Sequence, residues 1–149
     1  MRVKDIMKSP VITISRGASL REAVALLSSA GVSGLPVVDE EGRLAGMVSE
    51  HDIIQALMPR YEDMLLSEPA ILDADAMEAR AAVVRDQPVS RIMTTNVISV
   101  EEHETIMDAA SIMLIRRIKR LPVVRGLKPV GIISRIDIVE AVMQGKLKG

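Results

Sequence analysis

Two short segments of the chain carry a serine followed three residues later by an aspartate. The first is Ser49 and Asp52 in GMVSEHDIIQAL, and the second is Ser134 and Asp137 in GIISRIDIVEAV. Ahead of an apolar helical run, this spacing is typical of a capping box, and the local sequence favours that role. A hydroxyl and free amides at a helix start also suit an anion, and the nearby carboxylate can accept both hydroxyls of a ribose. The two uses are compatible, so both pairs are candidate ligand sites.

The two segments belong to a repeat that covers most of the chain. Residues 3–38 match residues 89–124 at ten of 36 positions, and residues 46–57 match 131–142 at five of twelve. Each copy predicts a strand, a capped helix, an apolar strand, a third strand and a short helix. A copy of roughly fifty residues buries too little surface alone. We therefore expect an α+β fold in which two tandem β-α-β-β-α repeats pack through their sheets about a pseudo-two-fold axis.

The connector between the copies is longer than an ordinary loop. In DADAMEARAAVVR, residues 73–85, acidic residues at the front and arginines at the rear complement a helix dipole. A helix packed on its own module is the simplest interpretation, and a regulatory or dimer-forming role is the alternative. YEDMLLSEP, residues 61–69, predicts another turn or two. The predicted organisation is repeat 1 at 1–58, a helical connector at 59–88 and repeat 2 at 89–149.

The composition argues against several functional classes. The net charge of -1 opposes a chain-wide attraction to nucleic acid, and Tyr61 is the only aromatic residue on which a base could stack. The absence of cysteine removes thiol catalysis and cysteine-based zinc sites, and His51 and His103 are not spaced as metal ligands. No leader-like segment or membrane-length apolar run is visible. We expect a cytoplasmic protein with no membrane contact, no metal and no catalytic residues.

The ordered set of motifs resembles a known family. DIM…PVITI, GVSGLPVVDEEGRLAGMVSEHDI, RIM…VISV and RIKRLPVV…PVGIISRIDI together resemble a pair of cystathionine β-synthase (CBS) domains, or Bateman module. Modules of this family bind AMP, ADP, ATP or S-adenosylmethionine, report to a partner and commonly dimerise into a disc of four repeats. The resemblance implies a ligand-sensing regulatory module that is not an enzyme. It needs no cofactor beyond an adenine nucleotide or S-adenosylmethionine as regulatory ligand. Its expected partners are a second copy of itself and an unidentified regulated protein.

The resemblance also implies roles for individual residues, with the ligands in clefts between the repeats. Asp52 and Asp137 are expected to bind ribose, and Ser49 and Ser134 phosphate. The adenine is expected to lie against aliphatic side chains and backbone, for which a plain core role is the alternative. The residues expected around it are Ile12, Val32, Gly34, Ile98 and Ile118.

The copies differ in charge where the family places phosphate contacts. Repeat 2 has Lys119, Arg120 and Arg135, whereas repeat 1 has serine, glycine and Glu50 at the equivalent positions. Basic residues at helix ends are usually solvated and also complement the helix dipole. The pattern nevertheless predicts two unequal pockets, with an anionic nucleotide in the second and a less charged adenosyl ligand in the first. The alternative is a constitutive dimerisation or scaffold module with vestigial pockets.

Overall fold

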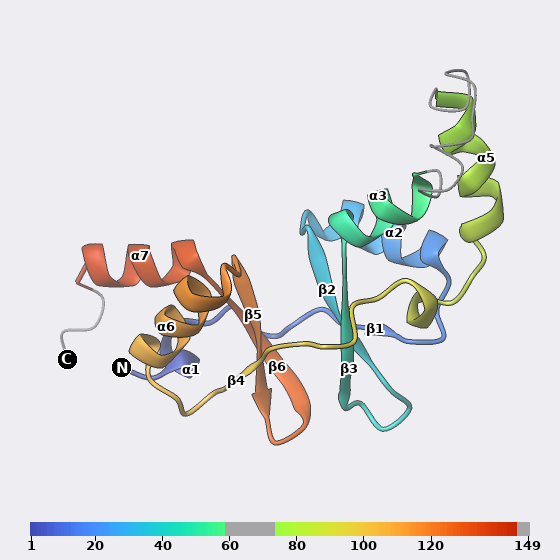
Figure 1. Cartoon of the computed structure of the whole chain (residues 1–149). Coiled ribbons are helices and arrows are strands. Elements are labelled where there is room, and N and C mark those ends of the chain that lie inside the picture. Colours follow the sequence, from blue (N-terminus) through green and yellow to red (C-terminus); the bar gives the residue numbers. More distant parts are fainter. Residues whose placement is uncertain (59–73, 146–149) are drawn as a thin grey trace. The chain divides into compact units, whose positions relative to one another are not determined.

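The computed structural model describes residues 1–58 and 74–145, which form two compact units (Figure 1). Each unit holds one three-stranded sheet covered by helices, so the predicted α+β class with two tandem β-α-β-β-α copies is confirmed. Unit 1 comprises Met1–Thr13, Glu40–Leu44 and Asn96–Gly149, and unit 2 comprises Ile14–Asp39 and Ala45–Thr95.

Unit 2 contains the sheet of the first repeat. Its sheet has the order β1-β2-β3, and β1 runs parallel to β2 with Ile14 opposite Val37. The crossover between these parallel strands is a helix, as a parallel pair requires. The elements are β1 (Ile14–Ser15), α2 (Leu20–Ala30), β2 (Gly34–Val38), β3 (Leu44–Ser49), α3 (Glu50–Leu57), α5 (Ala74–Val84) and a 3-10 turn at Val89–Arg91.

Unit 1 repeats this plan with the second repeat. Its sheet has the order β4-β5-β6, in which β4 is parallel and β6 antiparallel to β5. The elements are α1 (Val3–Ile6), β4 (Val100–Glu101), α6 (Ile106–Arg116), β5 (Arg120–Arg125), β6 (Lys128–Ser134) and α7 (Arg135–Met143).

The first long helix of each repeat starts at the predicted capping box. In α2 the Glu22 amide donates to Ser19 Oγ at 3.1 Å, and the Ser19 amide donates to Glu22 Oε2 at 2.9 Å. Thr105 and Asp108 do the same for α6. The two helices end differently, because the left-handed residue that follows α2 is Gly31 and the one that follows α6 is Arg117.

The leading segment of each repeat packs in the unit formed by the other repeat. In unit 1 the Val3 amide donates to Glu104 O at 2.8 Å, and in unit 2 the Val89 amide donates to Ala18 O at 2.7 Å. Both valines are fully buried in the cores of those units. The compact units therefore exchange their leading segments relative to the linear order of the repeats, whose boundaries in sequence remain a prediction.

The first strand of each repeat is shorter than predicted. The sequence predicted strands at 11–14 and 97–100, but pairing begins only at Ile14 and Val100 and lasts two residues. Continuing the register backwards would bring Pro36 and Pro122 into the ladder. Proline has no N–H to donate, which explains why β1 and β4 do not begin earlier in the sequence.

The connector helix is present as predicted and belongs to unit 2. Helix α5 packs against α3, where Arg80 Nε donates to Ala56 O at 3.3 Å. Val84, near its end, is buried in the core of unit 2. The further turn predicted at 61–69 lies outside the described residues.

Candidate functional site

Both serine–aspartate pairs form the predicted capping boxes. The Ser49 amide donates to Asp52 Oδ2 at 2.9 Å and the Asp52 amide donates to Ser49 Oγ at 3.3 Å, which starts α3. The Ser134 and Asp137 pair repeats both distances at the start of α7. In each pair the cap engages Oδ2 of the aspartate. The other oxygen, Oδ1, is therefore the one that a ligand hydroxyl could reach.

Each Oδ1 is met by a residue from the exchanged leading segment. Thr94 Oγ1 donates to Asp52 Oδ1 at 3.0 Å in unit 2, and Lys8 Nζ lies 3.6 Å from Asp137 Oδ1 in unit 1. Lys8 and Thr94 occupy equivalent repeat positions, so one carboxylate faces a cation and the other a hydroxyl. Sequence reasoning missed both residues, although the repeat alignment already marked them as a matched pair with different chemistry.

Backbone pairing fixes the position of these segments. Lys8 exchanges two hydrogen bonds with Ile132 in β6, at 2.9 and 3.0 Å, and Thr94 does the same with Met47 in β3, at 2.8 and 2.9 Å. Both bridges lie beside the glycines that open the repeated motif, where Met7 and Met93 pack against the bare backbone. The leading segments are thus seated beside the candidate carboxylates.

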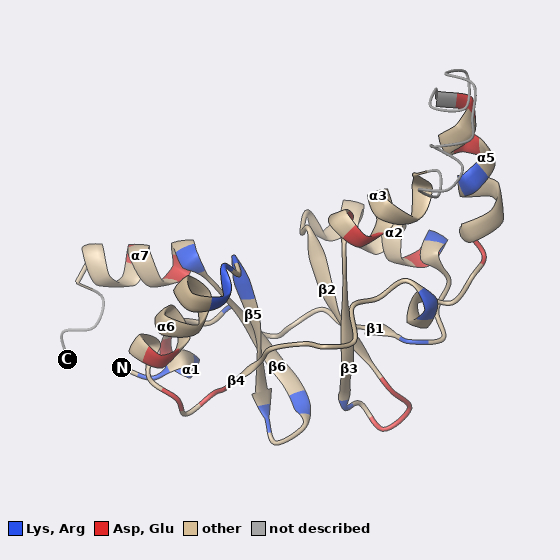
Figure 2. Cartoon of the chain, in the orientation of Figure 1, with Lys and Arg blue, Asp and Glu red and all other residues tan. Residues whose placement is uncertain are grey.

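The three predicted basic residues lie near one another in unit 1. Arg120 on β5 stands opposite Ser134 in the strand register. The Arg135 amide donates to Lys119 O at 3.1 Å, and its Nε donates to Ile118 O at 3.1 Å. Figure 2 shows blue where β5 and α7 begin and red where α3 begins. The serine, the aspartate and three cations therefore gather in unit 1, whereas Glu50 holds the equivalent first helical position in unit 2.

The predicted adenine-contacting residues divide between the units. Val32 is exposed and Gly34 is buried in unit 2, while Ile98 and Ile118 pack partly buried against the core of unit 1. Ile12, predicted for the first pocket, belongs to unit 1 and is 44% exposed. Their proposed contacts with a base remain predictions.

A hollow of about 310 Å³ opens between α2 and α3 of unit 2. It is mostly apolar, with Glu50 at its edge, and none of the predicted ligand-contacting residues lines it. Its lining residues are Val24, Leu27, Ser28, Glu50 and Ile53. Neither Asp52 nor Thr94, which bond to each other in the same unit, lines the hollow. The carboxylates of Asp52 and Asp137 are therefore the better candidate sites.

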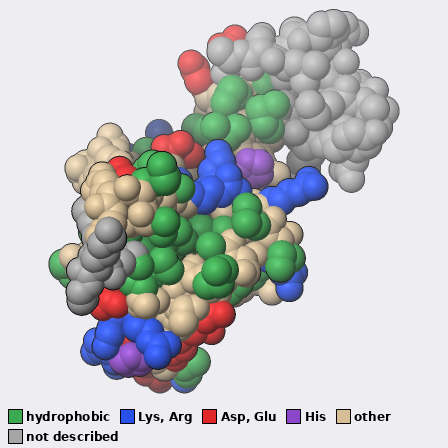
Figure 3. All heavy atoms as spheres, turned by 90° about the vertical axis from the view of Figure 1, so that its left-hand side faces the viewer, with side chains coloured by type: hydrophobic (Ala, Val, Ile, Leu, Met, Phe, Trp, Pro, Cys, Tyr) green, Lys and Arg blue, Asp and Glu red, His purple; other side chains and the backbone are tan. Residues whose placement is uncertain are grey.

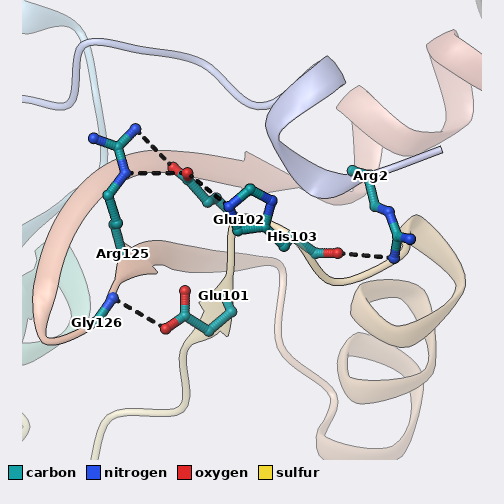
Figure 4. Close-up of polar contacts among 6 residues, drawn as sticks. All are labelled: Arg2, Glu101, Glu102, His103, Arg125 and Gly126. Atoms are coloured by element: carbon teal, nitrogen blue, oxygen red, sulfur yellow. Dashed lines mark hydrogen bonds and ion pairs between the residues drawn. The ribbon is translucent and has the colours of Figure 1, made fainter.

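A second polar cluster joins β4 to β5 in unit 1 (Figure 4). Arg125 donates through Nε and an Nη to the two oxygens of buried Glu102, at 3.0 and 3.1 Å. His103 Nε2 lies 3.3 Å from the same carboxylate, and Arg2 donates to His103 O at 2.9 Å. The hydrogen bonds from Arg125 hold the pKa of Glu102 below its usual range, although burial opposes them. The cluster links β4, β5 and the leading segment that carries Arg2, and we assign it a structural role.

We predict that Glu102 makes unit 1 sensitive to acid. Because its pKa is lower in the folded state, its contribution to stability is present above the unfolded value, about 4.3, and is lost as pH falls through the folded value. Urea midpoints measured between pH 7 and pH 3 should fall more steeply for the wild type than for Glu102→Gln, which should start lower at pH 7. Glu140→Gln on α7 controls for the loss of one carboxylate. If the urea midpoint fell equally steeply with pH for the wild type and for Glu102→Gln, the prediction would be wrong.

Within residues 1–58 and 74–145, no three histidine, aspartate or glutamate side chains come together as metal ligands. None of the helices in these ranges combines the length and apolar character that a membrane crossing requires.

Taken together, these features define a class of protein. It is an α+β module of two related units, each presenting a helix-capping aspartate beside a residue of the exchanged segment. A family model described as the CBS domain matches residues 3–59 and 89–144, and the chain belongs to the CBS-domain family.

Relatives and solved structures agree with this assignment. An uncharacterised protein of Methanocaldococcus jannaschii is 33% identical over 156 residues, covering 96% of this chain and 92% of that protein. The CBS domain pair of protein MJ0100, solved with 5′-methylthioadenosine and S-adenosylmethionine, is 30% identical with a TM-score of 0.70 and covers 98% of each chain. The protein CBSX2, solved in complex with AMP, is 28% identical with a TM-score of 0.73, covering 97% of this chain and 98% of that one.

Proposed function

We propose that this chain is a cytoplasmic regulatory module that binds an adenosine-containing ligand without transforming it. In this proposal it works as a homodimer and signals the bound state to a separate protein. The observation that carries the proposal is the pair of capped aspartates, Asp52 and Asp137, each with one oxygen in its helix cap and the other turned toward the leading segment. Two similar structures were solved with adenosine-containing ligands, which supports the same class of ligand for this chain.

The two units are proposed to prefer different ligands. In unit 1 Lys8 Nζ faces Asp137, and Arg135, two residues before Asp137, donates its amide to Lys119 O; these cations would suit a nucleotide with charged phosphates. Unit 2 offers Thr94 and Glu50 near Asp52, which suits a neutral or cationic adenosyl group such as methylthioadenosine or S-adenosylmethionine. This charge difference deepens the expectation of unequal pockets.

The leading segments offer a route for the signal. A ribose hydroxyl that takes Asp137 Oδ1 competes with Lys8, and Lys8 belongs to the leading segment of the other repeat. Ligand binding can shift a conformational equilibrium only if the two states differ in affinity. Displacement of Lys8 or Thr94 supplies such a difference.

The proposal is tested by a thermal-shift and calorimetric screen with AMP, ADP, ATP, S-adenosylmethionine and NADH. A ligand present at a hundred times its dissociation constant should stabilise the protein by about 2.7 kcal/mol. Asp52→Asn and Asp137→Asn, which keep an acceptor oxygen for the cap, should each abolish binding in one unit only.

The alternative is a constitutive scaffold with vestigial sites. The observation in its favour is that Thr94 and Lys8 already occupy the two carboxylate oxygens. No stabilisation across the whole panel, with Asp variants indistinguishable from the wild type, would overturn ligand sensing and favour the scaffold.

A further inference from the structure

A continuous segment of unit 2 contacts helix α3 at both of its ends. At the last turn of α3, Arg80 Nε from α5 donates to Ala56 O at 3.3 Å. At the first turn, Thr94 Oγ1 donates to Asp52 Oδ1 at 3.0 Å. Both donors belong to residues 74–94, which follow α3 in the chain and lie wholly within unit 2. We call this segment the α3 clamp.

The middle of the α3 clamp is fixed to the rest of unit 2. Val84, the last residue of α5, is buried in the core of the unit. The carbonyls of Gln87 and Arg85 accept the amides of Leu20 and Arg21, each at 2.9 Å, at the start of α2. A helix start leaves such amides without partners inside the helix, so these bonds anchor the clamp. A change at one end of the clamp therefore reaches the other end through α3 and not by sliding of the clamp.

The equivalent helix of unit 1, α7, is exposed at its end. Val142 in its last turn is 55% exposed, whereas the equivalent Leu57 of α3 packs partly buried against the core of unit 2. Met143 is 81% exposed and its counterpart Met58 is 40% exposed. Figure 3 shows hydrophobic side chains gathered on this side of unit 1. Since α7 starts at the same serine–aspartate cap as α3, the repeat folds without a covered last turn.

We propose that the α3 clamp couples ligand occupancy at Asp52 to the docking of α5 on α3, so that the connector helix reports the state of unit 2. This inference rests on the proposed function and names how the same site is read. A ribose hydroxyl that takes Asp52 Oδ1 removes the bond from Thr94 at the first turn. Helix α3 has eight residues and is a rigid rod about 12 Å long. A shift at its start therefore alters its fit against Arg80 and α5 at its end.

The coupling predicts equal effects in the two directions. If a ligand at Asp52 weakens the docking of α5, then weakening that docking must raise the affinity for the ligand by the same factor. The net contribution of one hydrogen bond corresponds to roughly a two- to tenfold change in an equilibrium constant. Each end of the α3 clamp is held by one side-chain hydrogen bond, so we expect effects of this size.

The first test uses the full chain without ligand and measures hydrogen exchange of the α5 amides. Thr94→Val keeps the shape of the side chain and removes the donor, so α5 should exchange roughly two- to tenfold faster. Exchange of α2 in the same unit is the reference for a general loss of stability and should change less. The matched control is Lys8→Met, which removes the corresponding contact in unit 1 and should leave α5 unchanged. Unaltered exchange of α5 in Thr94→Val, or an equal effect of Lys8→Met, would overturn the coupling.

The second test measures the reverse direction by calorimetry with S-adenosylmethionine. Arg80→Met removes the bond to Ala56 O at the end of α3 that lies away from Asp52. In an Asp137→Asn background, it should raise the affinity of unit 2 by the factor with which the ligand speeds exchange of α5. Binding with an unchanged affinity would overturn the proposal and leave ligand sensing intact. An absence of binding would instead count against the proposed function, and the ligand-free exchange would still decide whether the two ends of α3 are coupled.

Discussion

Replacing Gly46 with alanine should destabilise unit 2 by about 1–3 kcal/mol, the usual cost of forcing extra volume into a packed site. A Cβ at this position would lie 2.7 Å from Met93 Sδ and 2.7 Å from the backbone oxygen of Thr94. The thioether can rotate away, but the Thr94 carbonyl accepts the Met47 amide and cannot move without breaking that bridge. The expected result is a lower urea midpoint, with Thr94 also drawn off Asp52.

The glycines of the chain supply controls and a rescue. Gly17→Ala should be nearly silent, since its Cβ would meet nothing closer than Ser15 Oγ at 3.9 Å. Adding Met93→Ala to Gly46→Ala should restore little, because the backbone clash remains. A Cβ on residue 131 would lie 3.0 Å from the backbone oxygen of Lys8 and 2.5 Å from Met7 Sδ. The side chain is here the closer obstacle, so Met7→Ala should rescue Gly131→Ala more fully. Equal rescue at the two sites would refute the backbone explanation.

The helix starts could be predicted from the sequence because their determinants are local. Each box needs only a hydroxyl residue and an acid three positions apart, as Ser19 with Glu22 or Ser134 with Asp137. The short length of β1 and β4 could not be predicted in this way, because their pairing is limited by prolines on partner strands more than twenty residues away in the sequence. Pro36 limits β1 and Pro122 limits β4.

The exchange of the leading segments has no local signal. Val3 and Val89 are identical side chains in equivalent positions, so either could fill either core. Their destination is decided by long-range backbone bonds such as those between Lys8 and Ile132. The same exchange brings a lysine to Asp137 and a threonine to Asp52, which is why sequence reasoning found the carboxylates and missed their neighbours.

The exchange also bears on how a module without catalytic chemistry could report a ligand. The residues that face the candidate carboxylates sit on segments whose valines complete the core of the same unit. A ligand that displaces Lys8 therefore acts on a segment tied to unit 1 by Val3 and to unit 2 through the continuing chain. Under the proposed function, the charge beside Asp52 and the charge beside Asp137 would decide which ligand acts on which unit.

The proposed ligand preference of unit 1 should be reversed when the charge of Arg135 is reversed. Arg135→Glu is expected to weaken ATP binding in unit 1 by ten- to a hundredfold, which corresponds to about 1.4–2.8 kcal/mol. Arg135 is the first residue of α7, its amide donates to Lys119 O and its Nε donates to Ile118 O. The variant would place a carboxylate where the proposed function expects a cation for the phosphates. S-adenosylmethionine, whose 5′ group is cationic, should bind as well or better. Calorimetry in an Asp52→Asn background isolates unit 1.

Glu50→Arg is the mirror experiment. In an Asp137→Asn background it should raise the affinity of unit 2 for ATP and lower that for S-adenosylmethionine, and both effects should shrink in high salt, because exposed charges are screened. If Arg135→Glu instead weakens ATP and S-adenosylmethionine equally, the arginine acts by holding the entry to β5 through Ile118 and not by its charge. Opposite responses of the two ligands at both positions would establish that the charges of Glu50 and Arg135 contribute to the difference between the two sites.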